Sequence, residues 1–330
     1  MRGRRRTGTQ NNKIVPKLQT YLKDFGAVFF VILFFPYVIH VCAYGIEKNE
    51  PKQRNINDTY VVMDTSIGMQ KMPLEEYLIG ALAASIDTSY EEEVLKAQAV
   101  LLRTEIVHNK KIQSRTEETS HEESVYLKDV QQAYISISEM QKLYGSEFEN
   151  TYARLKHVVE ETQNIILVYQ GIPIEAPFCA VSAGSTRSAD EIFETKKYPY
   201  LQSVICESDV LSDDYYKNYY FSWNELQRAF DFGDAYEHKA EITKKDTVGY
   251  ALKIEIGDKS VSGEEFRQKL HLNSAHMDLD VLENGIRIQT KGLGHGLGMS
   301  QNMAQYLAKK GKDFIEILSF FYDNTEIEKE

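Results

Sequence analysis

The stretch from Met72 to Lys110, MPLEEYLIGALAASIDTSYEEEVLKAQAVLLRTEIVHNK, carries apolar residues at helical spacing in two segments. The first begins at Pro73, which a helix tolerates at its first position, and two glutamates follow where the helix dipole is positive. The second follows a turn, and Ser89 with Glu92 three residues later is a capping-box pattern. Alanines on both segments leave little side chain between them, so the sequence predicts two closely packed helices.

Strand and helix patterns mix irregularly in the rest of the chain. Thr59 to Asp64 alternates as a strand, while the polar stretch from Gln113 to Asp129 lacks a period and predicts an exposed loop. Glu147 to Thr162 predicts a helix, and Ser222 with Glu225 predicts a short capped one. Three hairpins are also expected: Ile165 to Tyr169 with Ile172 to Phe178, Tyr250 to Ile256 with Lys259 to Ser262, and Met277 to Leu282 with Ile286 to Lys291. Two helices are expected at the end of the chain, from Ser300 to Lys310 and from Phe314 to Tyr322. Because no βαβ rhythm links these elements, we expect an α+β fold.

The first 46 residues differ from the rest in charge. Residues 1 to 24 hold seven lysines and arginines against Asp24 alone, and Phe25 to Ile46 runs 22 residues without a formal charge. About 20 apolar residues cross a hydrocarbon core of roughly 30 Å, and the positive-inside rule keeps the basic flank in the cytoplasm. We therefore expect a basic cytoplasmic tail (1–24), a single transmembrane helix in the cell membrane (25–46), a linker (47–58) and an extracytoplasmic domain (59–330). A cleaved signal peptide is the alternative, which the length of the apolar run disfavours.

The composition fits a globular exterior region. Of 330 residues, 42% are hydrophobic and 26% are charged, which is enough apolar material for a real core. After the apolar run, 31 basic residues (38 minus 7) stand against 48 acidic ones (49 minus 1), a net charge of −17. This charge argues against nucleic acid as a partner. Cys179 and Cys206 lie in this region, and their spacing leaves open whether they pair.

The helix pair also carries a motif. It is similar to the pattern P-x-E-E-Y-x-x-G-x-x-A-x-E, a short turn, and A-L-K-A-Q-A-x-x-x-R-T of the stage II sporulation protein D (SpoIID) and amidase-enhancer family. The matching positions are Pro73, Glu75, Glu76, Tyr77, Gly80, Ala83, Lys96, Ala97, Gln98, Ala99, Arg103 and Thr104. The family's catalytic glutamate has no match, because Ser85 occupies its position.

A glycine-rich run, KGLGHGLGMSQ from Lys291 to Gln301, is the second motif. Taken alone it is compatible with a phosphate loop at a helix N-terminus, but no Lys-Ser or Lys-Thr pair follows the glycines. It is similar to the family's G-R-G-x-G-H-G-x-G-M-S-Q, with Lys291 in place of the arginine and Thr290 in place of the first glycine. The resemblance implies that this run lines a substrate cleft through His295, Gly296, Gly298, Ser300 and Gln301.

Two further segments extend the resemblance. Phe178 to Asp190 resembles the family's F-Y/H-S-T-S-G-G-x-T-x-S-A-E, and Val261 to Arg267 resembles its S-G-x-E-F-R element, which we expect to be structural. Ala180 and Val181 replace a Ser-Thr pair, so two hydroxyls that could bind sugar are missing. Together with Arg103 from the first motif, the residues that the resemblance assigns to substrate binding here are Ser182, Gly184, Thr186 and Ser188.

The resemblance implies an activity on peptidoglycan, but the residue at position 85 argues against catalysis in this chain. Members of this family act on peptidoglycan glycan strands as lytic transglycosylases during forespore engulfment, or enhance a partner amidase without catalysis. Glycosidic cleavage needs a carboxyl group that acts as general acid and then as base, and Ser85 cannot do this. Asp87 is the nearest substitute, but positions two apart on a helix face different ways, and it is otherwise a turn residue.

The resemblance also raises the question of zinc, because some relatives carry a His-Cys site before a Q-x-Y element. That element resembles Gln132-Ala133-Tyr134, and Val130 and Gln131 stand where the ligands would be. His121 has no thiolate or second histidine beside it, so we expect neither a metal nor a cofactor.

Three functions remain open at this point. The first is a membrane-anchored, SpoIID-like protein that binds or remodels peptidoglycan with weak or no lytic transglycosylase activity, alone or with a partner cell-wall hydrolase. The second is an active enzyme that uses a displaced carboxylate such as Asp87. The third is a scaffold without glycan affinity, which the Ala180-Val181 pair favours.

Overall fold

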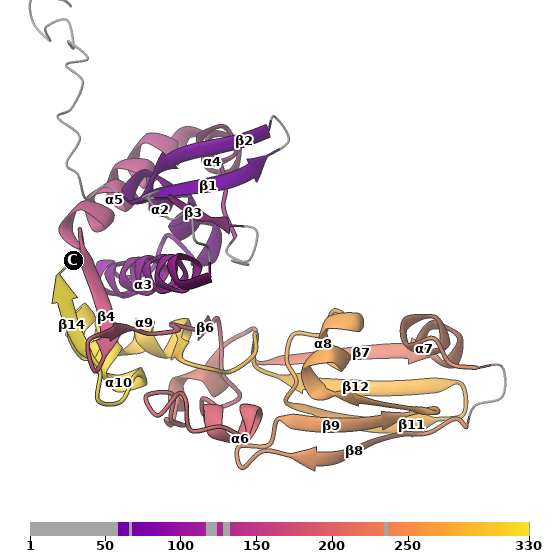
Figure 1. The fold of residues 1–330 in the computed structure, drawn as a ribbon. Helices are drawn as coiled ribbons and strands as arrows, with labels where there is room; N and C mark the ends of the chain where they lie inside the picture. The colour runs from indigo at the N-terminus through magenta and orange to yellow at the C-terminus, as the bar shows by residue number, and fades with distance from the viewer. Residues whose placement is uncertain (1–58, 66–67, 117–123, 128–132, 234–236, 330) are drawn as a thin grey trace, which may run out of the picture. The chain divides into compact units, whose positions relative to one another are not determined.

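The computed structural model describes residues 59–65, 68–116, 124–127, 133–233 and 237–329 (Figure 1). Asn57–Glu330 forms one compact unit. The predicted tail, transmembrane helix and linker lie outside the described residues, and so do His121, Val130 and Gln131, on which the zinc question depended. Within the described ranges, no helix is both long enough and apolar enough to cross a membrane.

The predicted helix pair is present as α2 (Leu74–Ser85) and α3 (Glu92–Thr116). Helix α2 is buried along most of its length, and Gly80 lies so close to the next layer that a Cβ there would stand 2.5 Å from the carbonyl oxygen of Ile135. One detail of the prediction is wrong, because α3 begins at Glu92 and Ser89 is not its cap. The backbone amide of Ser89 instead donates to the Asp87 carboxylate at 2.9 Å.

The first hydrophobic core surrounds this pair. Helix α3 packs against α2, α5, α9, α10 and strand β4, so it is the central element of this core. The other elements around it are β1 (Tyr60–Thr65), β2 (Gly68–Pro73), β3 (Ser124–Tyr126), α4 (Ile137–Tyr144), η2 (Gly145–Glu147), α5 (Phe148–Glu161), β4 (Ile165–Tyr169), β5 (Ile172–Pro173), α9 (Gln301–Lys309), α10 (Phe314–Phe321) and β14 (Glu326–Lys329).

A second hydrophobic core lies between two three-stranded sheets and two short helices. One sheet has the order β11-β12-β7 and the other the order β10-β9-β8, and both are antiparallel. The elements are β7 (Tyr216–Ser222), α7 (Trp223–Phe230), β8 (Ala240–Lys245), β9 (Ala251–Ile256), β10 (Lys259–Ser262), α8 (Gly263–Lys269), β11 (Met277–Leu282) and β12 (Gly285–Lys291).

The segments between the two cores come from the middle and the end of the chain. Strand β6 (Phe178–Cys179) pairs in parallel with β13 (Met299–Ser300), which places the segment after Phe178 beside the glycine-rich run. Helix α6 (Ala189–Phe193) and the 3-10 helix η3 (Glu207–Leu211) complete this region.

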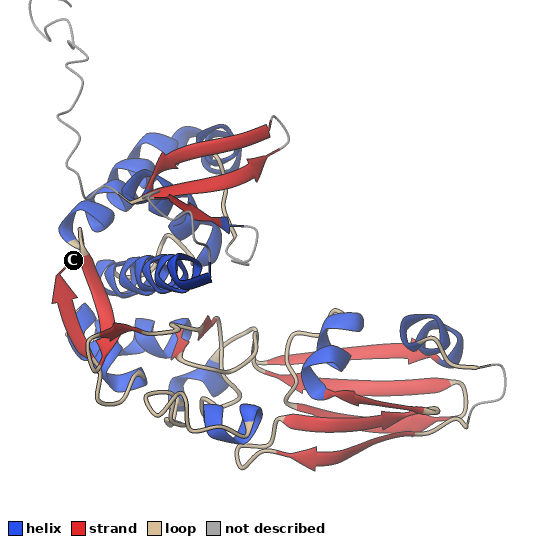
Figure 2. Ribbon diagram, viewed as in Figure 1, coloured by secondary structure: helices blue, strands red, loops and turns tan. Residues whose placement is uncertain are grey.

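Figure 2 shows both helices and strands, which alternate irregularly along the chain, and the predicted α+β class is confirmed. The Ser222 capping box and the second and third hairpins are also confirmed. The predicted loop from Gln113 to Asp129 is wrong at both ends, because α3 continues to Thr116 and β3 pairs in parallel with β1. The first hairpin is real but short, since β5 ends at Pro173 and Phe178 belongs to another sheet.

Candidate functional site

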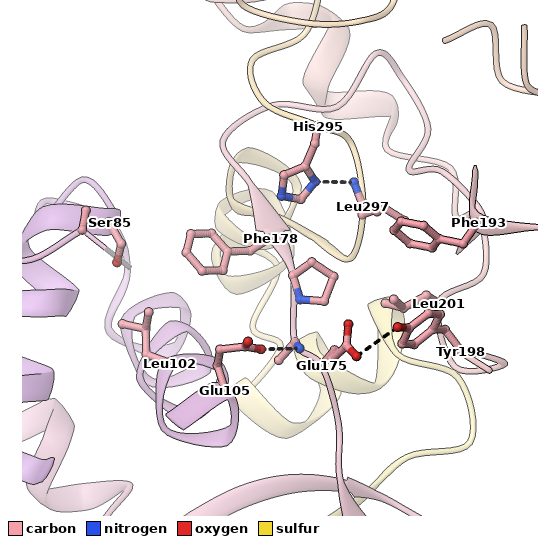
Figure 3. Close-up of a pocket in the computed structure, with 13 residues that line it drawn as sticks. Ser85, Leu102, Glu105, Glu175, Phe178, Phe193, Tyr198, Leu201, His295 and Leu297 are labelled. Atoms are coloured by element: carbon pink, nitrogen blue, oxygen red, sulfur yellow. Dashed lines mark hydrogen bonds between the residues drawn. The ribbon is translucent and has the colours of Figure 1, made fainter. Parts of the chain in front are cut away.

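A cavity of about 630 Å³ opens where four of these segments meet (Figure 3). The segments are the end of α2, one face of α3, the stretch before β6, and the glycine-rich run, with α6 and the residues after it on the far side. The lining residues are Ser85, Leu102, Glu105, Ala133, Glu175, Ala176, Pro177, Phe178, Phe193, Tyr198, Leu201, His295 and Leu297. Two residues of the predicted site, Ser85 and His295, therefore line one cavity although 210 positions of sequence separate them.

Two hydrogen bonds fix the position of Ser85, one through its hydroxyl and one through its backbone carbonyl. Its hydroxyl donates back to the carbonyl of Leu82 at 3.4 Å, and its own carbonyl accepts from the Gln301 side-chain amide at 2.8 Å. The same amide nitrogen lies 3.2 Å from Oε1 of Gln98 on α3. Gln301 is therefore a positioning residue, because it ties the glycine-rich run to the end of α2, where the resemblance expects the catalytic glutamate.

His295 presents a hydrogen-bond donor to the cavity. Its Nδ1 accepts from the backbone N–H of Leu297 at 3.0 Å, so the neutral ring carries its proton on Nε2. Burial lowers the pKa of His295 to about 4, and nearby Glu264 opposes that shift only in part. At neutral pH the ring is therefore uncharged, and it can donate to a ligand but is a poor proton acceptor through Nε2.

The desolvation of His295, which is partly buried in the cavity wall, predicts an acid sensitivity. In the unfolded chain the His295 ring binds a proton below its ordinary pKa of 6.5. In the folded chain the same ring stays neutral until about pH 4. Stability is therefore complete above pH 6.5 and falls as the pH drops from 6.5 to 4, by on the order of 1 to 3 kcal/mol from this group. Unfolding by urea at several pH values should show a smaller loss across this window in His295→Gln. His157→Gln, on the exposed face of α5, is the control and should match the wild type; equal slopes in all three proteins would contradict this role of burial.

Two glycines of the run are required by close packing. Gly298 has φ +66°, and a Cβ there would lie 1.8 Å from the carbonyl oxygen of Pro177. Gly296 has φ +79°, and its Cβ would lie 2.5 Å from the hydroxyl of Tyr250. Both glycines thus hold the run against neighbouring segments, and neither of them lines the cavity.

The close approach of Gly298 predicts a specific loss of stability. Gly298→Ala should lower the free energy of unfolding by about 1 to 3 kcal/mol more than Gly311→Ala, because overpacking adds to the strain of a positive φ. Gly311 is a matched control, since its φ is +85° and its Cβ would meet no atom within 4 Å. Thermal or urea unfolding of the two variants compares them directly; equal losses would mean that the Pro177 segment shifts without cost.

Several other predicted binding residues are buried around a carboxylate that the sequence analysis missed. The side chain of Asp209, fully buried in η3, accepts from the backbone N–H of Ser182 at 2.7 Å, the hydroxyl of Ser300 at 2.7 Å and the amide of Asn302 at 3.0 Å. Ser182 and Ser300 are themselves 0% exposed. These hydrogen bonds join η3, the segment after β6 and the start of α9. They support the cavity without lining it.

The remaining residues of the predicted site also lie outside the cavity lining. Thr186 is buried and accepts from the backbone N–H of Val204, and Ser188 bonds the side chain of Gln202. Gly184 takes a φ of +98° in the same segment. Arg103, 1% exposed, forms a two-pronged ion pair with Glu75 and donates to the carbonyl of Ile165, so its guanidinium is committed to the core of the fold.

Asp87, the proposed substitute carboxylate, is exposed in the turn between α2 and α3 and does not line the cavity. Two other carboxylates do line it, Glu105 on α3 and Glu175 before β6. Glu105 lies one helical turn after Leu102, which also lines the cavity. That i, i+3 spacing, which places both residues on one face of α3, is the only sequence feature that indicates its position. Glu175 carried no local signal, because the stretch that holds it was predicted to be a strand.

Two cysteines and one cluster of possible metal ligands lie outside the cavity lining. Cys179 and Cys206 are buried as free thiols, and burial raises the pKa of Cys206 to about 12. Glu92, His157 and Glu161 bring one ligand atom each within 4.8 Å of one another. The ammonium of Lys96 already lies 2.9 Å from Glu92 and 2.7 Å from Glu161, so this group is an ion-pair network.

Comparison with known proteins identifies the family of this chain. The family model described as stage II sporulation protein matches residues 64–169. Stage II sporulation protein D of Bacillus subtilis (strain 168) is 35% identical over 264 residues, which cover 78% of this chain and 75% of that protein. The protein of the same name from Bacillus amyloliquefaciens is 34% identical over 297 residues, covering 87% and 85%, and an uncharacterized protein of Brachyspira hyodysenteriae is 28% identical over 280 residues, covering 80% and 69%. The chain therefore belongs to the stage II sporulation protein D family, and these relatives support a role in sporulation.

Proposed function

We propose that this protein binds the glycan strands of peptidoglycan during sporulation, at forespore engulfment, and has weak or no lytic transglycosylase activity. It works through wall binding or through stimulation of a partner cell-wall hydrolase such as an amidase. A transmembrane helix at residues 25–46 anchors it in the cell membrane, with the basic tail in the cytoplasm and residues 59–330 outside.

One observation carries this proposal. Ser85, at the position of the family's catalytic glutamate, lines the same cavity as His295 and the ring of Phe178 (Figure 3). The cavity has the size of ordinary ligand sites, which span roughly 300 to 1,000 Å³, and it combines apolar walls with a few polar groups. The cavity therefore supports ligand binding at this position, while Ser85 offers a hydroxyl with no acid function at neutral pH where the family has its catalytic glutamate.

Muropeptide release and wall sedimentation test the proposal together. The full chain should sediment with insoluble peptidoglycan and release no anhydro-muropeptides from it. Release at a rate comparable with an active family member would overturn the weak-activity part. If no protein sediments, the third function, a scaffold without glycan affinity, replaces the proposal.

A second candidate is an active enzyme with a displaced carboxylate. Glu105 suits this role better than Asp87, because Asp87 accepts from the backbone N–H of Ser89 and does not line the cavity, while Glu105 lines it with Ser85. If the wild type does release anhydro-muropeptides, Glu105→Gln should abolish the release and Asp87→Asn should leave it unchanged.

A further inference from the structure

The cavity beside Ser85 is acidic. Glu105 and Glu175 line it, and among the described residues that line it there is no lysine or arginine. The oxygens of Glu105 accept from two uncharged donors, the Asn109 amide at 3.1 Å and the backbone N–H of Ala176 at 3.1 Å. In the described part of the chain, no basic nitrogen lies within 4 Å of the Glu105 carboxylate, so its negative charge is not neutralised by an ion pair.

Glu175 is only partly neutralised. Its Oε1 lies 3.2 Å from the ammonium of Lys197, 3.0 Å from the hydroxyl of Tyr198 and 3.7 Å from Nε2 of His108. The Lys197 side chain is 64% exposed, and exposed ion pairs of this kind contribute little and are screened by salt. The two carboxylates together therefore leave the cavity with net negative charge.

The walls of the cavity suit a cation as well. Phe178, Phe193 and Tyr198 line it, and the face of an aromatic ring attracts an ammonium group. The protein itself gives an example at the rim, where the Lys197 ammonium lies 4.8 Å from the centre of the Tyr198 ring while it contacts Glu175. The hydrogen bonds that Lys197 donates to Tyr198 and Glu175 raise its pKa, which means that this arrangement stabilises a protonated amine.

We propose that this cavity recognises a primary amine on its cell-wall ligand, in preference to the same ligand with that amine acetylated. The inference rests on the proposed function, because it takes the ligand to be peptidoglycan. A de-N-acetylated amino sugar and the free side-chain amine of a diamino acid in the wall peptide share this chemistry. Glu105 is the main recognition group, because its charge has no internal partner, and Glu175 with the aromatic rings completes the subsite.

Two matched pairs of probes test this with the full chain. The first pair is a glucosamine tetramer and an N-acetylglucosamine tetramer; the second is a wall tripeptide with a free lysine amine and the same tripeptide with that amine acetylated. Calorimetric titration at low salt should show about tenfold tighter binding of the amine member in one pair, which is what one charge-assisted contact supplies. The pair that shows the preference identifies the source of the amine. Equal binding within both pairs, or tighter binding of the acetylated members, overturns the inference.

Variants separate the cavity from the general charge of the protein. Glu105→Gln and Glu175→Gln should each reduce the preference at least about threefold, as should raising the salt from low to physiological concentration. Glu147→Gln removes one exposed charge on η2, away from the cavity, and should leave the preference unchanged. A preference that Glu147→Gln lowers as much as Glu105→Gln would assign it to the overall net charge of −11 and overturn the subsite.

The result separates this inference from the proposed function. If the protein sediments with insoluble wall but shows no preference within either pair, the amine subsite is wrong and glycan binding stands. If it neither sediments nor binds any probe, both fail. The wild-type comparison of matched probes needs no variant, so it decides the matter even if a glutamine variant does not fold.

Discussion

Ser85→Glu is expected to raise the rate of glycan cleavage by about 10² to 10⁴, the range that general acid–base help supplies. The side chain would enter a cavity that already holds a hydrogen-bond donor at His295 and an aromatic wall at Phe178. The backbone at Ser85 is fixed by the Gln301 amide, so the new carboxyl group starts from a defined position. Release of anhydro-muropeptides from purified peptidoglycan measures the effect.

The matched control is Ser85→Gln, which has the size of glutamate and no acid. It should remain as inactive as the wild type and should bind wall equally well. If Ser85→Glu is also silent while both variants still sediment with peptidoglycan, the cleft has diverged beyond the loss of one group, and stimulation of a partner hydrolase becomes the better account. Cleavage by Ser85→Gln would show that the acid at this position is not what limits the reaction.

Arg187→Met is expected to lower the free energy of unfolding by about 3 to 5 kcal/mol, because it leaves a buried carboxylate without its partner. Arg187 and Asp246 are 4% and 2% exposed and lie 2.7 Å apart. The guanidinium also lies 4.7 Å from the centre of the Tyr250 ring and donates to the carbonyl of His295. The pair thus links the segment after β6, the turn before β9 and the glycine-rich run.

An exposed ion pair of the same length provides the control. Arg287 and Asp280 also lie 2.7 Å apart, but both side chains are about 60% exposed, at 62% and 59%. Arg287→Met should cost no more than about 1 kcal/mol, as exposed pairs do. Urea unfolding of both variants gives the comparison, and adding Asp246→Asn to Arg187→Met should recover part of the loss, since it removes the unpaired charge and keeps an acceptor for the amide of Tyr250. Equal losses at the two sites would show that burial of Arg187 does not matter.

Local signals in the sequence were sufficient where the structure is local. Three correctly predicted features each depend on residues within a few positions of one another. They are the α2 and α3 pair, the Ser222 cap, and the hairpin of β9 and β10. The elements that were missed depend on distant partners. Strand β3 is only three residues long and is a strand because β1 lies beside it, and β6 exists only through its pairing with β13.

The same distinction applies to the candidate site. The motif resemblance led to Ser85 and His295, which the fold brings to one cavity, but it could not separate residues that line the cavity from residues that support it. Ser182 and Ser300 turned out to bond Asp209, and Arg103 turned out to bond Glu75. Glu105 could not be found, because a glutamate on a helix has no feature that distinguishes a cavity from solvent until the segment before β6 covers it.

The bond between Gln301 and Ser85 has a consequence for the order in which the protein matures. It joins residues 216 positions apart, so it forms only after the chain has been synthesised beyond Gln301. Contacts of such separation form late, since the entropy of closing the intervening loop must first be overcome. A chain that has been synthesised only as far as α3 lacks the glycine-rich run. Its cavity therefore lacks the lining residues His295 and Leu297. The complete cavity therefore forms only when the last helices of the chain have been made.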